Sequence, residues 1–282
     1  MNNLKTVGLL ALLSALLASV VGWLGGWDNF GLMLAVVVGF NLLAYFFSDK
    51  MALAASRARP VTEEELPQVY AMVRRLTMQM DMPMPTIHVI DSPQPNAFAT
   101  GRSPRHAAVA VTNGILQTLN SEELEAVLGH ELAHVKNRDI LIGSVAAMIG
   151  AALSIVARMG FWFGGGDNRN NPLGAIGALL SVIIAPIVAM LIQFAISRTR
   201  EFQADKSGAE MTGRPLQLAS ALEKISAGTA RIPMAVNPAT ASLYIDNPLK
   251  ALRGRGVSRL FSTHPPVEER IERLHKMAMG VS

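Results

Sequence analysis

Four stretches of this sequence contain no Asp, Glu, Lys or Arg at all. They occupy residues 6–27, 30–48, 141–157 and 173–197. A helix of about 20 apolar residues is long enough to cross the hydrocarbon core of a bilayer. Only 16% of the chain is charged, compared with about 25% in an ordinary soluble domain. The sequence therefore predicts about four transmembrane helices and excludes a plain water-soluble globular protein or a disordered chain.

The four apolar stretches predict two hairpins, one in residues 1–48 and one in residues 140–197. The first hairpin has only Asp28 and Asn29 between its two stretches, which fits a tight turn. In the second hairpin the stretch 141–157 is near the lower length limit for a span, and the last stretch contains Pro186. The second hairpin therefore either spans the membrane or lies partly within the protein.

Lys and Arg side chains gather at the same ends of both hairpins. Lys5 and Lys50 flank the first hairpin, and Lys136 and Arg198 flank the second, whereas the Asp28–Asn29 turn has no basic residue. Basic residues accumulate on the cytoplasmic side of membrane proteins. We therefore expect both termini, and the soluble parts 49–139 and 198–282, to face the cytoplasm. The two parts are expected to form one catalytic domain.

The chain contains no cysteine and carries a net charge of +4. Without cysteine, any bound metal must be held by histidine and carboxylate side chains. The basic balance follows the membrane topology, and no basic stripe with interleaved aromatic residues is present. Nucleic acid is therefore not expected as a partner, whereas the lipid bilayer is.

Local patterns predict helices and a small sheet in the soluble parts. A helix is expected from Thr62 to Met80, with Thr62 and Glu65 as a capping box. Strands are expected at 86–90 and 107–112, and residues 96–100 lie between them, near turn residues. Another helix is expected from residue 120 or 121 to about residue 138, again with a capping box, and the second soluble part reads as mainly helical. The predicted fold class is a mainly α integral membrane protein with an α+β catalytic domain and a small sheet.

The second predicted helix contains the sequence H-E-L-A-H at residues 130–134. Residues four apart on a helix share one face, so His130 and His134 can bind one Zn²⁺. Glu131 then lies beside the metal, where it can act on a water molecule as a general base. The alternative interpretation of the same pattern is a solvated helix with two ordinary histidines.

A catalytic zinc ion normally has three protein ligands and one open position. Glu201 is the candidate for the third ligand, because the second hairpin returns it to the membrane face near His134. Asp205, one turn further along, can orient a ligand imidazole. The alternative for Glu201 is an ion pair with Arg198 or Arg200.

In combination these motifs resemble the HtpX-type membrane zinc metalloproteases, relatives of the CAAX prenyl endopeptidases. The resemblance covers nearly the whole chain and includes the sequences H-E-L-A-H, S-R-T-R-E-F-Q-A-D at 197–205 and F-S-T-H-P-P at 261–266. It implies a zincin-like catalytic domain with one zinc ion on His130, His134 and Glu201, and Glu131 as the catalytic base. It also implies that the chain lies in a bacterial inner membrane and that its substrates are damaged or misfolded membrane proteins.

The resemblance further implies roles for Asn96, His264 and Arg270. Asn96 is expected beside an edge strand that pairs with the substrate backbone, and Arg270 is expected to help organise the site. His264 could be a fourth zinc ligand, an oxyanion donor or a structural residue. Because a fourth protein ligand would close the open position, we predict that His264 is the oxyanion donor.

Two other functions are compatible with parts of the sequence. A prenyl-peptide processing endopeptidase would use the same chemistry on a different substrate, but four apolar segments are few for the enclosed chamber of those relatives. A non-enzymatic membrane scaffold or transporter would need polar residues along a pathway. The four apolar stretches contain no charged residue, which disfavours this second alternative.

Overall fold

The structure is a computed structural model. It describes residues 30–141, 143–145, 198–236, 240–251 and 265–281, together with residues 8, 11 and 14. The expected spans at 6–27, 141–157 and 173–197 lie almost entirely outside these residues, and so does the stretch 252–264, which contains His264.

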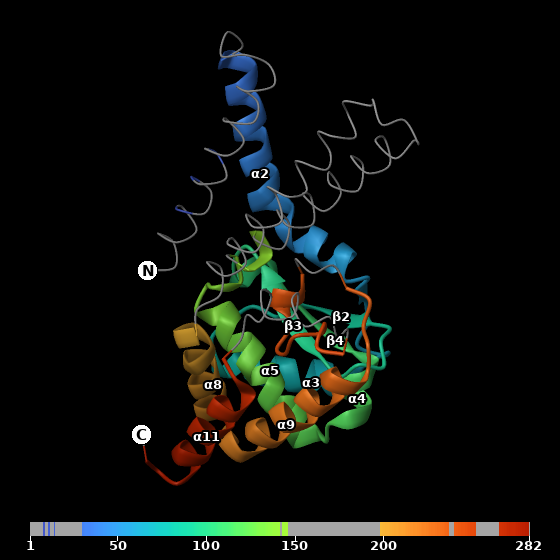
Figure 1. Ribbon diagram of the computed structural model, residues 1–282, viewed down its shortest axis with the longest axis vertical. Coiled ribbons are helices and arrows are strands. Elements are labelled where there is room, and N and C mark those ends of the chain that lie inside the picture. Colours follow the sequence, from blue (N-terminus) through green and yellow to red (C-terminus); the bar gives the residue numbers. More distant parts are fainter. Residues whose placement is uncertain are drawn as a thin grey trace, which may run out of the picture.

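Helices surround one small sheet (Figure 1). The helices are α2 (Phe30–Ala55), α3 (Pro67–Gln79), α4 (Asn113–Thr118), α5 (Ser121–Lys136), α8 (Arg198–Thr212), α9 (Pro215–Arg231) and α11 (Val267–Ala278), with the 3₁₀ turns η2 (Pro104–His106) and η3 (Ala241–Leu243). The strands are β1 (Arg59–Pro60), β2 (Thr86–Ile90), β3 (Ala97–Gly101) and β4 (Ala107–Thr112). The expected combination of helices with a small sheet is therefore confirmed for the described residues.

The sheet is mixed, and its strand order is β1-β2-β4-β3. β2 and β4 run parallel, with Thr86 opposite Ala108. β3 is antiparallel to β4, with Ala97 opposite Val111, and it forms one edge of the sheet. The predicted strands 86–90 and 107–112 are confirmed, and residues 97–101 form the edge strand beside Asn96.

Both faces of the sheet are covered, and both soluble parts of the chain contribute to the cover. One face joins α3, α5, α8 and α9 in a single core, in which Val109, Leu128 and Leu222 are almost completely buried. The other face packs Phe98 and Tyr244 against the end of α2. α5 lies at the centre of the helical layer and contacts α3, α8, α9 and β3. This helix therefore connects the sheet to the second part of the chain.

The capping prediction is correct for α5 and wrong for α3. In α5 the Asn120 side chain accepts from the backbone of Glu123, and the Glu123 side chain accepts from the backbone of Asn120. α3 begins at Pro67 and not near Thr62. Proline is well suited to the first turn of a helix, and it disfavours helical backbone at the residue before it. Leu66 consequently has φ −133° and lies outside the helix.

α2 projects from the body that contains the sheet and α5 (Figure 1). Its large apolar side chains are open to the surroundings: Leu42, Leu43 and Phe46 are between 45% and 54% exposed. Among the described residues, no helix combines the length and hydropathy of a membrane span. The expected span 30–48 lies in the first part of α2.

Candidate metal centre

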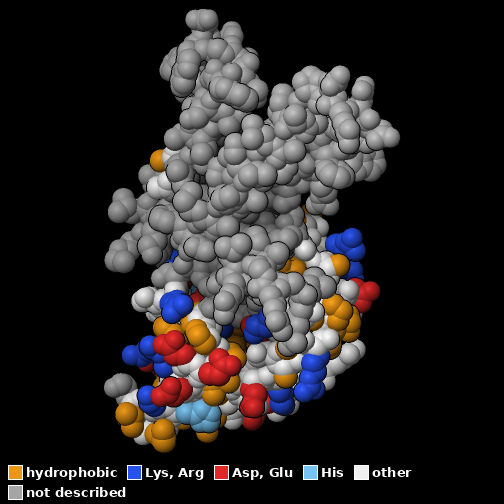
Figure 2. Space-filling model, in the orientation of Figure 1, with side chains coloured by type: hydrophobic (Ala, Val, Ile, Leu, Met, Phe, Trp, Pro, Cys, Tyr) orange, Lys and Arg blue, Asp and Glu red, His pale blue; other side chains and the backbone are white. Residues whose placement is uncertain are grey.

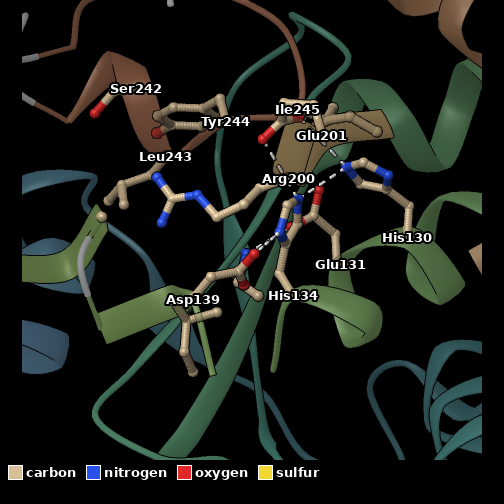
Figure 3. A pocket seen from close by; sticks show the side chains of 13 residues that line it. His130, Glu131, His134, Asp139, Arg200, Glu201, Ser242, Leu243, Tyr244 and Ile245 are labelled. Carbon is tan, nitrogen blue, oxygen red and sulfur yellow. Dashed lines mark hydrogen bonds and ion pairs between the residues drawn. The ribbon is translucent and has the colours of Figure 1, made fainter. Parts of the chain in front are cut away.

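The predicted ligands come together from two helices that are far apart in the sequence. His130 and His134 lie on α5, and Glu201 lies in the first turn of α8. Their ligand atoms all lie within 4.8 Å of one another. Figure 3 shows the two imidazole rings and the Glu201 carboxylate converging on one point. Among the residues that the structure describes, this is the one group of three such side chains close enough to hold a metal ion.

The spacing of these atoms fits a zinc ion. The Nε2 atoms of His130 and His134 are 3.2 Å apart, and Glu201 oxygens lie 3.9 Å and 3.6 Å from them. Two nitrogens bound at about 2.0–2.1 Å to a tetrahedral zinc would be about 3.3–3.4 Å apart. The histidine nitrogens already have nearly this separation. A small movement of the Glu201 carboxylate would bring one of its oxygens to a similar distance from both nitrogens.

A buried carboxylate lies beside the second nitrogen of each histidine. Oδ1 of Asp205 is 2.9 Å from Nδ1 of His130, and Oδ2 of Asp139 is 3.1 Å from Nδ1 of His134. A carboxylate that accepts the Nδ1 proton leaves the Nε2 lone pair for the metal. The position of Asp205 agrees with the sequence prediction, whereas the sequence analysis did not identify Asp139.

Arg270 on α11 neutralises Asp205. Its Nε and Nη2 atoms donate to both carboxylate oxygens of Asp205, at 2.8 Å and 2.6 Å. Nη1 donates to the backbone oxygen of Ile245 at 3.1 Å. Only 2% of Arg270 is exposed, so the pair is shielded from solvent. The structure thus places Arg270 where it holds Asp205 and the chain near Ile245 in position, consistent with the organising role that the resemblance implies.

The protonation of the site follows from burial and from these pairs. Burial alone would favour neutral Asp205, but Arg270 outweighs it and holds the pKa of that carboxyl well below its usual range. Burial also opposes the charged form of His134, yet the carboxylates of Asp139 and Glu201 raise the pKa of His134 to about 10. Burial lowers the pKa of His130. A metal cation would replace the proton on a ligand imidazole, because only the deprotonated nitrogen binds metal.

Glu131 occupies the position expected of a catalytic base. It is 2% exposed, and burial raises the pKa of its carboxyl to about 7. A general base works best when its pKa lies near the working pH. Its Oε2 accepts a hydrogen bond of 2.9 Å from the backbone N–H of Ala99 on β3. The Glu131 carboxylate therefore links α5 to the edge strand β3.

Asn96 immediately precedes the edge strand and binds a neighbouring segment of the chain. Its Nδ2 donates to the backbone oxygen of Asp246 at 2.8 Å, and its Oδ1 accepts from the backbone N–H of Ala97 at 3.2 Å. The side chain is fully buried. Its location beside an edge strand agrees with the prediction, while contact with a substrate stays a prediction.

A segment that the sequence analysis did not identify forms one wall of the cavity. Ser242, Leu243, Tyr244 and Ile245 line it together with the metal-binding group and Arg200 (Figure 3). The backbone N–H of Ile245 donates to the oxygen of Ala97 at 2.9 Å. On the open side of β3, the backbone oxygen of Ala97 and the backbone N–H of Ala99 therefore already have hydrogen-bond partners, which are Ile245 and Glu131. A peptide that pairs with this edge has to exchange with these contacts.

Two histidines one helical turn apart, a carboxylate from a second helix and a buried glutamate beside them form the arrangement of a metallopeptidase. The family model for Peptidase family M48 matches residues 63–278. The chain belongs to this family.

Curated relatives match the chain over almost its full length. The "Protease HtpX homolog" of Pelotomaculum thermopropionicum is 50% identical and covers 99% of this chain and 100% of its own. That of Thermodesulfovibrio yellowstonii is also 50% identical, with 99% of both chains covered. That of Gemmatimonas aurantiaca is 46% identical, with 99% and 100% covered. The crystal structure of S. mikatae Ste24p aligns with a TM-score of 0.49 and 17% identity, covering 94% of this chain and 65% of that one.

Proposed function

We propose that this chain is a zinc-dependent endopeptidase that hydrolyses peptide bonds at the cytoplasmic face of a bacterial inner membrane. The observation that carries the proposal is the convergence of His130, His134 and Glu201 beside the buried base Glu131. Damaged or misfolded membrane proteins are the proposed substrates. The "Protease HtpX homolog" name of the relatives supports the peptidase part of the proposal.

The apolar surface of α2 supports the membrane location. Leu42, Leu43, Phe46 and Phe47 are each about half exposed, which in water would be unfavourable for a cluster of this size. Near the end of the apolar run, Arg102 donates to the backbone oxygen of Phe46 at 3.3 Å, and the Lys50 ammonium lies 5.5 Å from the ring centre of Phe47. Cationic side chains at this level fit the headgroup region of a bilayer.

In the proposed reaction a substrate peptide lies extended along β3 and near Ala99. Glu131 accepts a proton from the attacking water and passes it to the leaving amine. His264, which lies outside the described residues, donates to the developing oxyanion. A bound zinc ion would supply Lewis-acid polarisation of the carbonyl and would lower the pKa of water toward about 7. Arg270 and the two outer carboxylates keep the ligand side chains in place during these steps.

The experiment compares the wild-type protein with two carboxylate variants, all purified in detergent. Zinc content and cleavage of an unfolded protein are measured on the same preparations. We expect about one zinc per chain in the wild type. Glu131→Gln should keep the zinc and lose turnover, because it removes the base. Glu201→Ala should lose zinc affinity, because it removes a ligand.

Glu210→Ala is the matched control, since Glu210 lies on the same helix α8 and is exposed. It should retain both zinc and activity. Full zinc content and full activity in Glu201→Ala would contradict the ligand assignment. A wild type that cleaves a farnesylated peptide and leaves the unfolded protein intact would replace the proposed substrate class by prenylated peptides.

A further inference from the structure

Asp139 lies just beyond the end of the helix that carries the two histidines. Its Oδ2 is 3.1 Å from Nδ1 of His134, and the residue is only 7% exposed. Figure 3 shows its carboxylate directed at the outer side of the His134 ring, opposite the metal-binding nitrogen. The same cavity is lined by Glu201 and Arg200.

An unusual backbone turn brings Asp139 back to the helix. Arg138 has φ 56°, a left-handed conformation that is natural for glycine and costly for a residue with a Cβ atom. The N–H of Arg138 donates to the oxygen of Val135 at 3.1 Å, and the N–H of Asp139 donates to the oxygen of His134 at 3.3 Å. These bonds close the end of α5 and place residue 139 beside His134. Such a strained conformation persists only where the surrounding contacts hold it in place, and it is common at functional sites.

We propose that Asp139 is a positioning residue that orients His134 for the metal. By accepting the Nδ1 proton, it keeps the Nε2 lone pair of His134 directed at the point where His130 and Glu201 converge. Asp205 has the corresponding place beside His130. Each ligand histidine thus has its own buried carboxylate. This inference rests on the proposed metal function.

The two carboxylates differ in their other partners. Asp205 makes a bidentate pair with Arg270. Oδ1 of Asp139 is buried without a hydrogen-bond partner among the described residues. The charge of Arg200 also acts on Asp139, but within the described part of the chain Asp139 has no bidentate partner such as Arg270. Its negative charge is therefore less neutralised than that of Asp205 and acts more directly on His134. Consequently the charge of Asp139, and not only its hydrogen bond, should strengthen metal binding.

The test measures zinc affinity by competition with a chelator of known affinity. Asp139→Ala removes both hydrogen bond and charge, and should raise the Kd for zinc about 10–100-fold, the usual effect of losing an outer partner of a metal ligand. Asp139→Asn keeps an acceptor oxygen and loses the charge, so its Kd should lie between those of the wild type and Asp139→Ala. The visible spectrum of the cobalt-substituted protein should change in the same order, because it reports the ligand geometry.

Glu125→Ala is the control for general loss of a buried carboxylate on α5. Glu125 is 9% exposed and forms an ion pair with Arg75 at 2.5 Å. It precedes both histidines in the sequence. The zinc affinity of the Glu125→Ala variant should match that of the wild type. An Asp139→Ala protein whose zinc Kd stays within about twofold of the wild type, or changes no more than that of Glu125→Ala, would overturn the proposal.

Two further results have distinct meanings. If Asp139→Ala does not fold, Asp139→Asn decides: an intermediate rise in Kd supports the proposal, and an unchanged Kd overturns it. A wild type that binds no zinc would overturn the proposed function and this inference together. A wild type that binds zinc as tightly as both Asp139 variants would overturn this inference alone.

Discussion

At the scale of single residues, the site is a set of buried charges that depend on each other. Asp205 is stable as a buried anion because Arg270 donates two hydrogen bonds to it. At Glu131, burial outweighs the attraction of His134 and Arg270 and raises the pKa of the carboxyl to about 7. Buried carboxyls on α5 and α8 therefore differ in proton affinity, and these differences follow from their neighbours. Separation of pKa values between adjacent groups is how acid and base roles are divided in enzymes.

The first prediction concerns His264, on the sequence S-T-H-P-P. Pro265 and Pro266 restrict the backbone after it, so the imidazole can be presented at little cost in ordering entropy. We expect His264→Ala to lower kcat by about 10²–10³, the usual effect of removing an oxyanion donor. KM and zinc content should stay nearly unchanged. Steady-state kinetics on a fluorogenic peptide, with metal analysis of the same sample, would measure this.

The outcomes for His264 separate its three possible roles. Loss of zinc in His264→Ala would indicate a ligand. An unaltered kcat with a lower melting temperature would reduce His264 to a structural residue. His275→Ala is the matched control, because His275 lies on the exposed side of α11 and should change none of these quantities.

At the scale of elements, the close approach of α8 to α5 brings Glu201 to the histidines. Gly208 on α8 makes this approach possible. A Cβ atom at Gly208 would lie 2.7 Å from the backbone nitrogen of His130 and 2.9 Å from its Cα. These distances are too short for any side chain, and the obstacle is backbone, which cannot rotate away. The absence of a side chain at 208 is thus part of the geometry of the metal site.

The second prediction follows from this contact. Gly208→Ala should separate α8 from α5 and lower the free energy of unfolding by about 1–3 kcal/mol, as overpacking of a tight interior does. Because Glu201 and Asp205 move with α8, zinc affinity should fall as well. Thermal unfolding and chelator competition would measure the two effects. Ser207→Ala is the control at the neighbouring, less buried position of the same helix, and equal behaviour of the two variants would contradict the prediction.

How much the sequence predicts depends on how local each signal is. The capping box of Asn120 and Glu123 lies within four residues, and it is present as predicted. The ligands His130 and His134 are also local, one turn apart. Thr62 and Glu65 formed an equally good local pattern, but Pro67 sets the start of α3. A local signal is thus reliable until a stronger one lies close to it.

Contacts between distant segments are harder to predict. Glu201 could be predicted because the sequence between it and His134 is expected to form an apolar hairpin, which would return the chain to one place. Asp139 was missed, because its contact with His134 depends on the left-handed turn at Arg138, a residue type that gives no turn signal. The wall at residues 242–245 has no motif either. Its position depends on bonds such as that between Asn96 and Asp246, 150 residues apart.

At the scale of the whole molecule, two distant parts of the chain build one body. Val109 and Leu128 from the first part share a core with Leu222 and Leu274 from the second. The face in Figure 2 shows acidic and basic side chains intermixed over this body. α2 joins the body through its C-terminal end, and Leu42, Leu43 and Phe46 on this helix are exposed. Because the two parts share a core, both have to lie on the same side of any membrane that the apolar segments enter.

The third prediction is therefore that the C-terminus lies in the cytoplasm together with the metal site. Lys5, Lys50, Lys136 and Arg198 all lie at one end of the two apolar hairpins, and basic residues favour the cytoplasmic side. A phosphatase reporter that is active only outside the cytoplasm should be silent when it is fused after Ser282.

The same reporter inserted in the glycine stretch at residues 164–166, between the third and fourth apolar segments, should be active if the second hairpin spans the membrane. A silent reporter there, with a silent fusion after Ser282, would mean that the second hairpin stays on the cytoplasmic side and is embedded in part. Strong activity from the fusion after Ser282 would contradict the topology as a whole. The shared core would then require the first soluble part, and the metal site with it, to be outside the cytoplasm as well.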